Sequence, residues 1–360
     1  MGRRSLAITV LVVLCAASSG WADVFNMGPG LTSLETVPVG NPGNTGELSG
    51  SGAGGYGPDR VCGAVAYEYR IGKYEVTAEQ YTEFLNKVAA ADTYGVYNAN
   101  MWSDTEHGCR IQQSGDSGSY SYSVALEWAN RPVNYVSFLD ACRFANWLHN
   151  GQRTGPQGPE TTERGAYTLD GYDGSDGRTI RRNADWQWAV PSEDEWYKAA
   201  YHKNDGDTGN YFDYPTGIDF APGQDMADIL GNNANYYTGS GPYPIDDGKY
   251  TTLVGEFQNS PSPYGTFDQG GNVWEWHEAS LDQDLDPGLR GGSFHGDASY
   301  LVASRRFAFC QAYEAYDISF GFRVVQVPEP ASTALLALGY VLSLSKGGLA
   351  MIRQRRRRKG

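Results

Sequence analysis

One short stretch of the chain concentrates residues whose types could do chemistry. It spans residues 270–276, Gly-Gly-Asn-Val-Trp-Glu-Trp, and residues 289–294, Leu-Arg-Gly-Gly-Ser-Phe, follow it. Glycine pairs allow a close backbone approach or a positive φ. Glu275 between two tryptophans would be a costly buried charge unless a cation neutralised it. We expect either a metal ion or an ion pair with Arg290 or Arg323.

Helices that would frame this stretch are predicted by their N-terminal caps. Thr77 and Gln80 form a capping box, and the apolar spacing after it predicts a helix over residues 78–90. Ser137 caps a second predicted helix over residues 138–149. Ser192 and Glu195 form another capping box, which predicts a third helix. These helices would supply the framework behind the chemical stretch.

Strands and loops fill the rest of the body. Alternation over residues 65–74 predicts a strand before the first helix, and residues 322–324 predict a last core strand. Residues 150–180 and 203–250 are rich in Gly, Asp, Asn, Tyr and Pro and are predicted to be loops. Loops of that length are uncommon in a compact domain unless something pins them.

The N-terminal segment has the pattern of a secretory signal. Arg3 and Arg4 precede an apolar run over residues 6–17, and Ala22 is a small residue after it. This pattern predicts a signal peptide over residues 1–22. Residues 23–60 are rich in Gly, Asn, Ser and Pro, and we expect a flexible lead-in there.

The C-terminal segment has three parts in order. Pro-Glu-Pro at 328–330 leads into an apolar run over 331–352, broken by Lys346, and a basic cluster over 353–359 follows. The run is long enough to cross a bilayer, with the basic cluster on the cytoplasmic side. Residues 328–360 resemble the PEP-CTERM sorting signal of Gram-negative bacteria. The resemblance implies an exosortase-type protease at the inner membrane and delivery to the cell surface, outer envelope or matrix.

Charge and cysteine content narrow the function classes. Without the predicted leader and tail, the chain loses nine of 28 basic and one of 42 acidic residues, so the body has a net charge near −22. Such a body is not expected to bind nucleic acid. An exported protein meets an oxidising compartment, which favours one or two disulfides. Three pairings are open among Cys62, Cys109, Cys142 and Cys310.

Several of these blocks together resemble one protein family. These blocks resemble the formylglycine-generating enzyme family, also called the sulfatase-modifying-factor domain. They are residues 71–77 with the helix after them, 192–196, 270–276, 289–294 and 321–323. The resemblance covers residues 61–327. It implies an α+β fold, an elaborated C-type lectin fold with small twisted antiparallel sheets, a few helices and long packed loops.

The family's oxidase activity depends on a copper ion held between two cysteines. The family motif, matched from Gly291, places those two positions at Gly296 and Leu301, which cannot ligate a metal. We therefore expect no copper and a non-catalytic binding or matrix module. The alternatives are a formylglycine-generating-type oxidase with an altered metal site and a structural coat protein. The resemblance implies a groove for a peptide or glycan ligand, lined by Trp276, Ser293, Phe294, His295 and Tyr300.

The family also holds structural calcium, which prefers oxygen ligands. The resemblance implies a first site formed by Asn235, the Tyr236 carbonyl, Asp247 and the Lys249 carbonyl. It implies a second site formed by Glu275 and the carbonyls of Gly270, Gly271 and Val273. In the second site the metal ion would be the cation that Glu275 requires.

Overall fold

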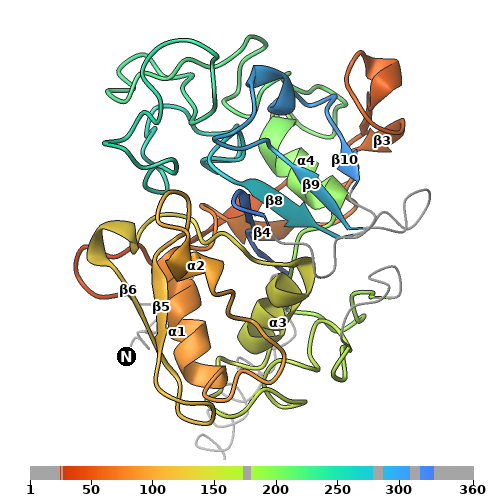
Figure 1. Ribbon diagram of the computed structural model, residues 1–360. Helices are drawn as coiled ribbons and strands as arrows, with labels where there is room; N and C mark the ends of the chain where they lie inside the picture. Colours follow the sequence, from red (N-terminus) through yellow and green to blue (C-terminus); the bar gives the residue numbers. More distant parts are fainter. Residues whose placement is uncertain (1–24, 26, 173–179, 279–286, 309–316, 328–360) are drawn as a thin grey trace, which may run out of the picture.

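The computed structural model describes residues 25, 27–172, 180–278, 287–308 and 317–327 (Figure 1). The predicted signal peptide, the predicted sorting tail and Cys310 lie outside these residues. Within the described part of the chain, no helix is long and apolar enough to cross a membrane.

The described part of the chain contains four α-helices, and three of them begin where the caps predicted. They are α1 (Ala78–Val88), α2 (Asn100–Ser103), α3 (Phe138–His149) and α4 (Glu193–Tyr201). The side chains of Thr77, Ser137 and Ser192 each accept a bond from a backbone N–H three residues on. Asp140 completes a capping box at α3, which the sequence analysis had not identified. Single turns of 3-10 helix occur at η1 (Ser51–Ala53), η2 (Leu126–Trp128) and η4 (Ala298–Tyr300).

A first sheet joins segments from both ends of the described chain. Its order is β1 (Thr36–Val39), β4 (Tyr69–Gly72), β12 (Val325–Gln326) and β7 (Trp188–Ala189), and all of its pairs are antiparallel. β4 is a four-residue segment of the strand predicted over residues 65–74.

The segment expected to be a flexible lead-in contributes to this fold. β1 lies at 36–39, and β2 (Glu47–Ser49) pairs with β3 (Arg60–Cys62). The Gly50 N–H donates to the Ser304 carbonyl at 2.9 Å, so the glycine-rich turn packs on the body. The composition was misleading because the glycines serve tight turns. Gly50 has φ 122° and Gly54 has φ 81°.

A second sheet carries the chemical stretch. Its order is β10 (Phe307–Ala308), β9 (Gly288–Arg290), β8 (Trp274–His277) and β11 (Phe320–Gly321), with β11 parallel to β8. The strand expected at 322–324 is instead the link between β11 and β12, which joins the two sheets. A separate hairpin pairs β5 (Ile111–Ser114) with β6 (Ser121–Val124).

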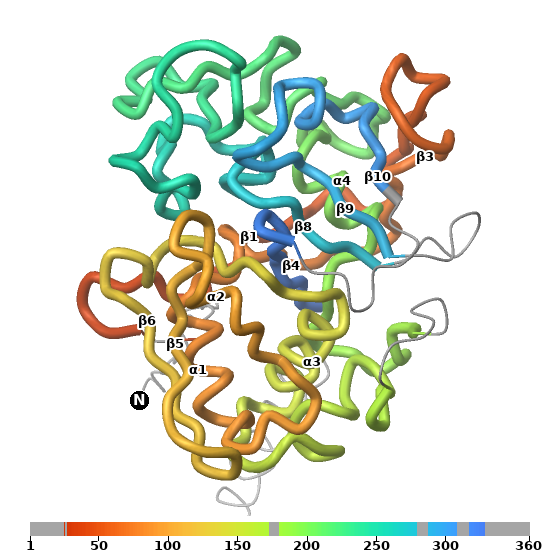
Figure 2. Tube along the Cα trace, viewed as in Figure 1, coloured from red at the N-terminus to blue at the C-terminus, as the bar shows by residue number. Residues whose placement is uncertain are grey.

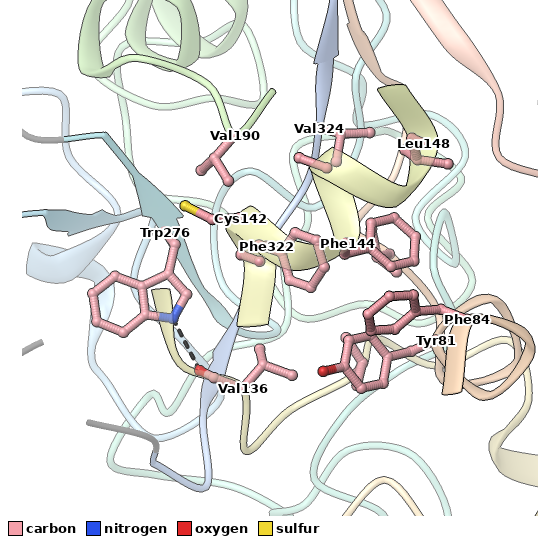
Figure 3. Packing of buried hydrophobic residues seen from close by; sticks show 14 of the residues in the cluster. Tyr81, Phe84, Val136, Cys142, Phe144, Leu148, Val190, Trp276, Phe322 and Val324 are labelled. Atoms are coloured by element: carbon pink, nitrogen blue, oxygen red, sulfur yellow. Dashed lines mark hydrogen bonds between the residues drawn. The ribbon is translucent and has the colours of Figure 1, made fainter. Parts of the chain in front are cut away.

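The main core lies between α1, α3 and the link between the sheets. Phe144 packs edge-on against Phe84 and Phe322, with ring centroids 5.4 and 5.3 Å apart (Figure 3). Trp276 reaches the same core from β8. The loops between α4 and β8 gather at the end of the molecule opposite α1 (Figure 2). The fold is therefore α+β, with small sheets, few helices and long packed loops.

Candidate functional site

Glu275 is fully buried and its charge is balanced by an arginine. Arg323 donates from Nε to Oε2 and from Nη2 to Oε1, both at 2.5 Å. The indole N–H of Trp196 donates to Oε2 at 2.7 Å. Of the two ion pairs left open by the sequence, the structure forms the one with Arg323. Arg290 binds Glu193 instead, at 2.7 Å.

The ligands predicted for the second calcium site are not suited to calcium in the structure. Glu275 was the only charged ligand in that set, beside the carbonyls of Gly270, Gly271 and Val273. Both of its oxygens already accept bonds from Arg323. A guanidinium in bidentate contact with the carboxylate removes the electrostatic need for a metal ion.

One ligand of the first predicted calcium site is suited to calcium. The Oδ1 of Asn235 is buried and accepts no hydrogen bond from the described residues. Such an oxygen suits calcium. The carbonyl of Tyr236 accepts a bond from Gln224, however, and the side chain of Asp247 is 97 % exposed. The backbone of Gly271, from the second predicted site, packs against the carbonyl of Asn235, so these two residues of the two sites are neighbours.

A second buried carboxylate lies close to Glu275 and was not identified from the sequence. Glu75 is 1 % exposed, and neither of its carboxyl oxygens has a hydrogen-bond partner among the described residues. Burial raises the pKa of Glu75 well above its usual range, and the charges of Asp268 and Glu275 raise it further. Burial also raises the pKa of Asp268, to about 7. Three carboxyl groups thus surround the single guanidinium of Arg323.

The predicted groove is not formed by the residues chosen for it. Trp276 is 0 % exposed, because its ring packs on Phe138 and its Nε1 donates to the Val136 carbonyl at 3.0 Å (Figure 3). Ser293 and Phe294 are buried as well. Tyr300 is half-buried against Trp274 and Arg305. Of the five predicted residues, only His295 is exposed.

The two positions matched to copper ligands hold no thiol. Leu301 is fully buried in a small apolar cluster with Ala234 and Tyr236, and Gly296 is half-buried near the surface. The three cysteines of the described chain are distributed elsewhere and remain unpaired: Cys62, Cys109 and Cys142. The disulfides expected on the prediction of export are therefore absent among these three. Burial raises the pKa of Cys62 and Cys109 to about 11, so both thiols stay protonated at neutral pH.

An aromatic patch surrounds Gly296 instead of a thiol pair. We define it as His107, Tyr237, Tyr243, Tyr250 and His295. Successive ring centroids lie 5.2 Å apart for Tyr237 and Tyr243, 5.5 Å for Tyr243 and Tyr250, and 4.5 Å for Tyr250 and His107. The patch residues are half-buried or exposed. Aromatic rings held in this way provide contact area at low entropic cost.

Backbone bonds tie the patch to the segment that follows Ser293. The N–H of Tyr237 donates to the Gly296 carbonyl at 2.8 Å, and the Tyr243 hydroxyl donates to the Phe294 carbonyl. The Tyr250 hydroxyl donates to Glu106 at 3.1 Å. The long loops between α4 and β8 are thereby pinned at the place where the family's copper ligands were expected.

Asp104 positions one histidine of the patch. Its Oδ2 lies 3.3 Å from Nδ1 of His107 and accepts the hydroxyl of Tyr135 at 2.5 Å. Its Oδ1 accepts the backbone N–H groups of Glu106 and His107 at 3.0 and 3.1 Å. Tyr135 has φ 59°, which is unusual for a bulky residue and is found where a side chain must be aimed. The His107 ring is therefore fixed from several sides.

Of the patch residues, the sequence predicted only His295, as part of the groove, because the members come from three distant segments. His107 follows α2, the tyrosines lie in the loops between α4 and β8, and His295 follows β9. No local spacing links them. The available signal was compositional, since four tyrosines occur between residues 236 and 250.

Comparison with known proteins identifies related domains. The model of the sulfatase-modifying factor enzyme 1-like domain matches residues 54–328. Treponema denticola variable protein 1 is 18% identical with a TM-score of 0.49, over 84% of this chain and 98% of that chain. CarF is 20% identical with a TM-score of 0.45, over 82% and 99%. PvdO from Pseudomonas aeruginosa is 17% identical with a TM-score of 0.46, over 82% and 95%. The comparison with curated proteins returns no match.

Proposed function

Because the chain belongs to the sulfatase-modifying factor enzyme 1-like domain family, we propose that it is an exported ligand-binding module that lacks the family's copper chemistry. The observation that carries this proposal is the replacement of both copper-ligand positions by Gly296 and Leu301, with an aromatic patch around Gly296. The described thiols are buried and protonated, which is the wrong state for a metal ligand. The chain keeps the family fold, and the aromatic patch offers contact area for a ligand.

The ligand of this module is a peptide or a glycan that lies across the aromatic patch. The rings of Tyr237, Tyr243, Tyr250 and His107 are linked by centroid distances of 5.2, 5.5 and 4.5 Å, so the row spans at most about 15 Å. A chain at ~3.3 Å per residue would place four or five residues on it. Aromatic walls supply most of the contact energy in such sites.

The proposal is tested by ligand arrays with matched variants of the purified protein. Tyr250→Ala should remove binding to any peptide or glycan that the wild type retains. Phe220→Ala is the control, because Phe220 is 65% exposed and lies outside the patch. Equal binding by wild type and Tyr250→Ala would refute the location of the site.

The rival function, a formylglycine-generating-type oxidase, has its own assay. Copper is added to the purified protein together with a cysteine-containing peptide under oxygen. The module should form no formylglycine aldehyde in the peptide. Oxygen-dependent conversion of the peptide cysteine to formylglycine, absent from a control with copper and no protein, would show that the protein is an enzyme and would overturn the binding-module proposal.

Export and sorting complete the proposal. The signal peptide at 1–22 and the tail at 328–360 would send the body through the inner membrane, with the tail removed by an exosortase-type protease. Mass spectrometry of the protein from the envelope should find an N-terminus after Ala22 and a C-terminus near Pro328. Recovery of the intact tail on the mature surface protein would contradict the processing step.

A further inference from the structure

Two histidines of the aromatic patch lie close enough to share a metal ion. The ring centroids of His107 and His295 are 5.2 Å apart, and the ring planes are nearly perpendicular at 78°. Two imidazoles that ligate one tetrahedral ion through bonds of about 2.0–2.1 Å place their centroids about 5 Å apart. The observed separation equals that expected for a shared ion, and it is reached by residues 188 positions apart in the chain.

The nitrogen atoms of both rings are suited to ligation. Asp104 holds Nδ1 of His107, which leaves Nε2 as the nitrogen for a metal ion. A carboxylate behind a ligating histidine fixes its tautomer and orientation, and such partners are a regular feature of metal sites. Neither ring nitrogen of His295 is used in a hydrogen bond within the described residues.

The site would be open on its solvent side. Among the described residues, no group of three or more His, Cys, Asp or Glu side chains is placed to hold a metal ion. The protein therefore supplies two ligands, and water or an oxygen of a bound ligand supplies the others. Because His295 is exposed, an ion can enter without any movement of the core. Paired imidazoles favour Zn²⁺, Cu²⁺ or Ni²⁺ over calcium or magnesium.

We propose that His107 and His295 form an open binding site for a divalent transition-metal ion on the aromatic patch. This site is distinct from both predicted calcium sites and uses none of the sulfur ligands of the family's oxidase. An ion there would give the patch a fixed positive charge and a coordination position for a carboxylate or hydroxyl of the ligand.

The test measures metal binding and not activity. Purified full-length protein is titrated with Cu²⁺ by calorimetry, and its EPR spectrum is recorded at one equivalent. We expect one ion per chain and hyperfine coupling from two imidazole nitrogens. His295→Ala should weaken binding at least tenfold, and Asp104→Asn should weaken it by about ten- to a hundredfold through loss of the orienting carboxylate.

The controls separate this site from other histidines and from misfolding. His149→Ala removes a half-buried histidine on α3, far in the sequence from the patch, and should leave the affinity unchanged. His107→Phe keeps a ring in the packed position and should abolish the two-nitrogen spectrum while the thermal unfolding curve stays cooperative. Unchanged affinity in His295→Ala, or equal losses in His149→Ala and His295→Ala, would overturn the inference. The Tyr250→Ala variant is also titrated with Cu²⁺. If it binds the ion but no peptide or glycan, the metal site is supported independently of the proposed ligand.

Discussion

Replacing Glu75 by Gln should stabilise the protein at neutral pH and have the opposite or no effect in acid. The carboxyl group is 1 % exposed and its oxygens have no partners among the described residues. Because burial raises its pKa in the folded state, Glu75 binds a proton in the folded protein at pH values where the unfolded chain has released it. Its contribution to stability is therefore complete below the unfolded pKa near 4.5 and is lost as the pH rises toward the folded pKa.

The size of the effect has an upper bound. Each pH unit over which the folded carboxyl keeps a proton that the unfolded one has lost costs about 1.4 kcal/mol, so the cost at pH 7 reaches at most about 3 kcal/mol. Gln carries no such cost, but its amide adds donors that need partners, at about 1–2 kcal/mol. We therefore expect Glu75→Gln to be more stable than wild type at pH 7, by at most about 2 kcal/mol.

Urea unfolding at pH 4.5 and pH 7.5 measures this directly. The difference in unfolding free energy between variant and wild type should grow with pH, by at most about 4 kcal/mol between the two conditions, and the cost of the amide cancels in that comparison. Glu160→Gln controls for the change in net charge, since Glu160 is 83% exposed. A difference that stays constant with pH would show that Glu75 is ionised in the folded state, and the account of the buried carboxyl groups would be refuted.

Three further outcomes are expected. Arg323→Met should lower the unfolding free energy by about 3–5 kcal/mol in a urea titration, because Glu275 loses its buried partner; a loss below 1 kcal/mol would mean that the ion pair is dispensable. Thr77→Ala should cost about 1 kcal/mol in the same assay through loss of the α1 cap, and Thr77→Ser should restore most of it. If calcium binds at Asn235, elemental analysis should find it in the purified protein and EGTA should lower the melting temperature, whereas a metal-free protein with unchanged melting would exclude that site.

Local signals in the sequence predicted the helices well and the strands poorly. A capping box depends on residues three positions apart, so Thr77 and Ser192 identify the starts of α1 and α4 without tertiary information. The strands are two to four residues long, which is too short for a pattern of alternation to define their limits. The link at Phe322 was mistaken for a strand because a buried apolar segment has the same composition in either conformation.

The candidate site was predictable only where one residue determines the chemistry. Glu275 between two tryptophans required a cation, and Arg323 was one of the two partners named beforehand. The groove prediction failed because a resemblance to a family assigns residues to motif positions but does not show whether their side chains reach the surface. Trp276 lies in the core. His107 and His295 are 188 positions apart in the chain, so no local spacing indicates their contact.

The position of β12 has a consequence for how the molecule is made. This strand comes from the last part of the described chain, yet it lies between β4 and β7 in the middle of the first sheet. A chain that is synthesised from its N-terminus onward cannot close that sheet until residue 326 has left the ribosome. Pairings of such long sequence separation form slowly and leave intermediates with unpaired edges. The first sheet should therefore close in one late step, and a chain that stops before residue 325 should yield a product that proteases remove.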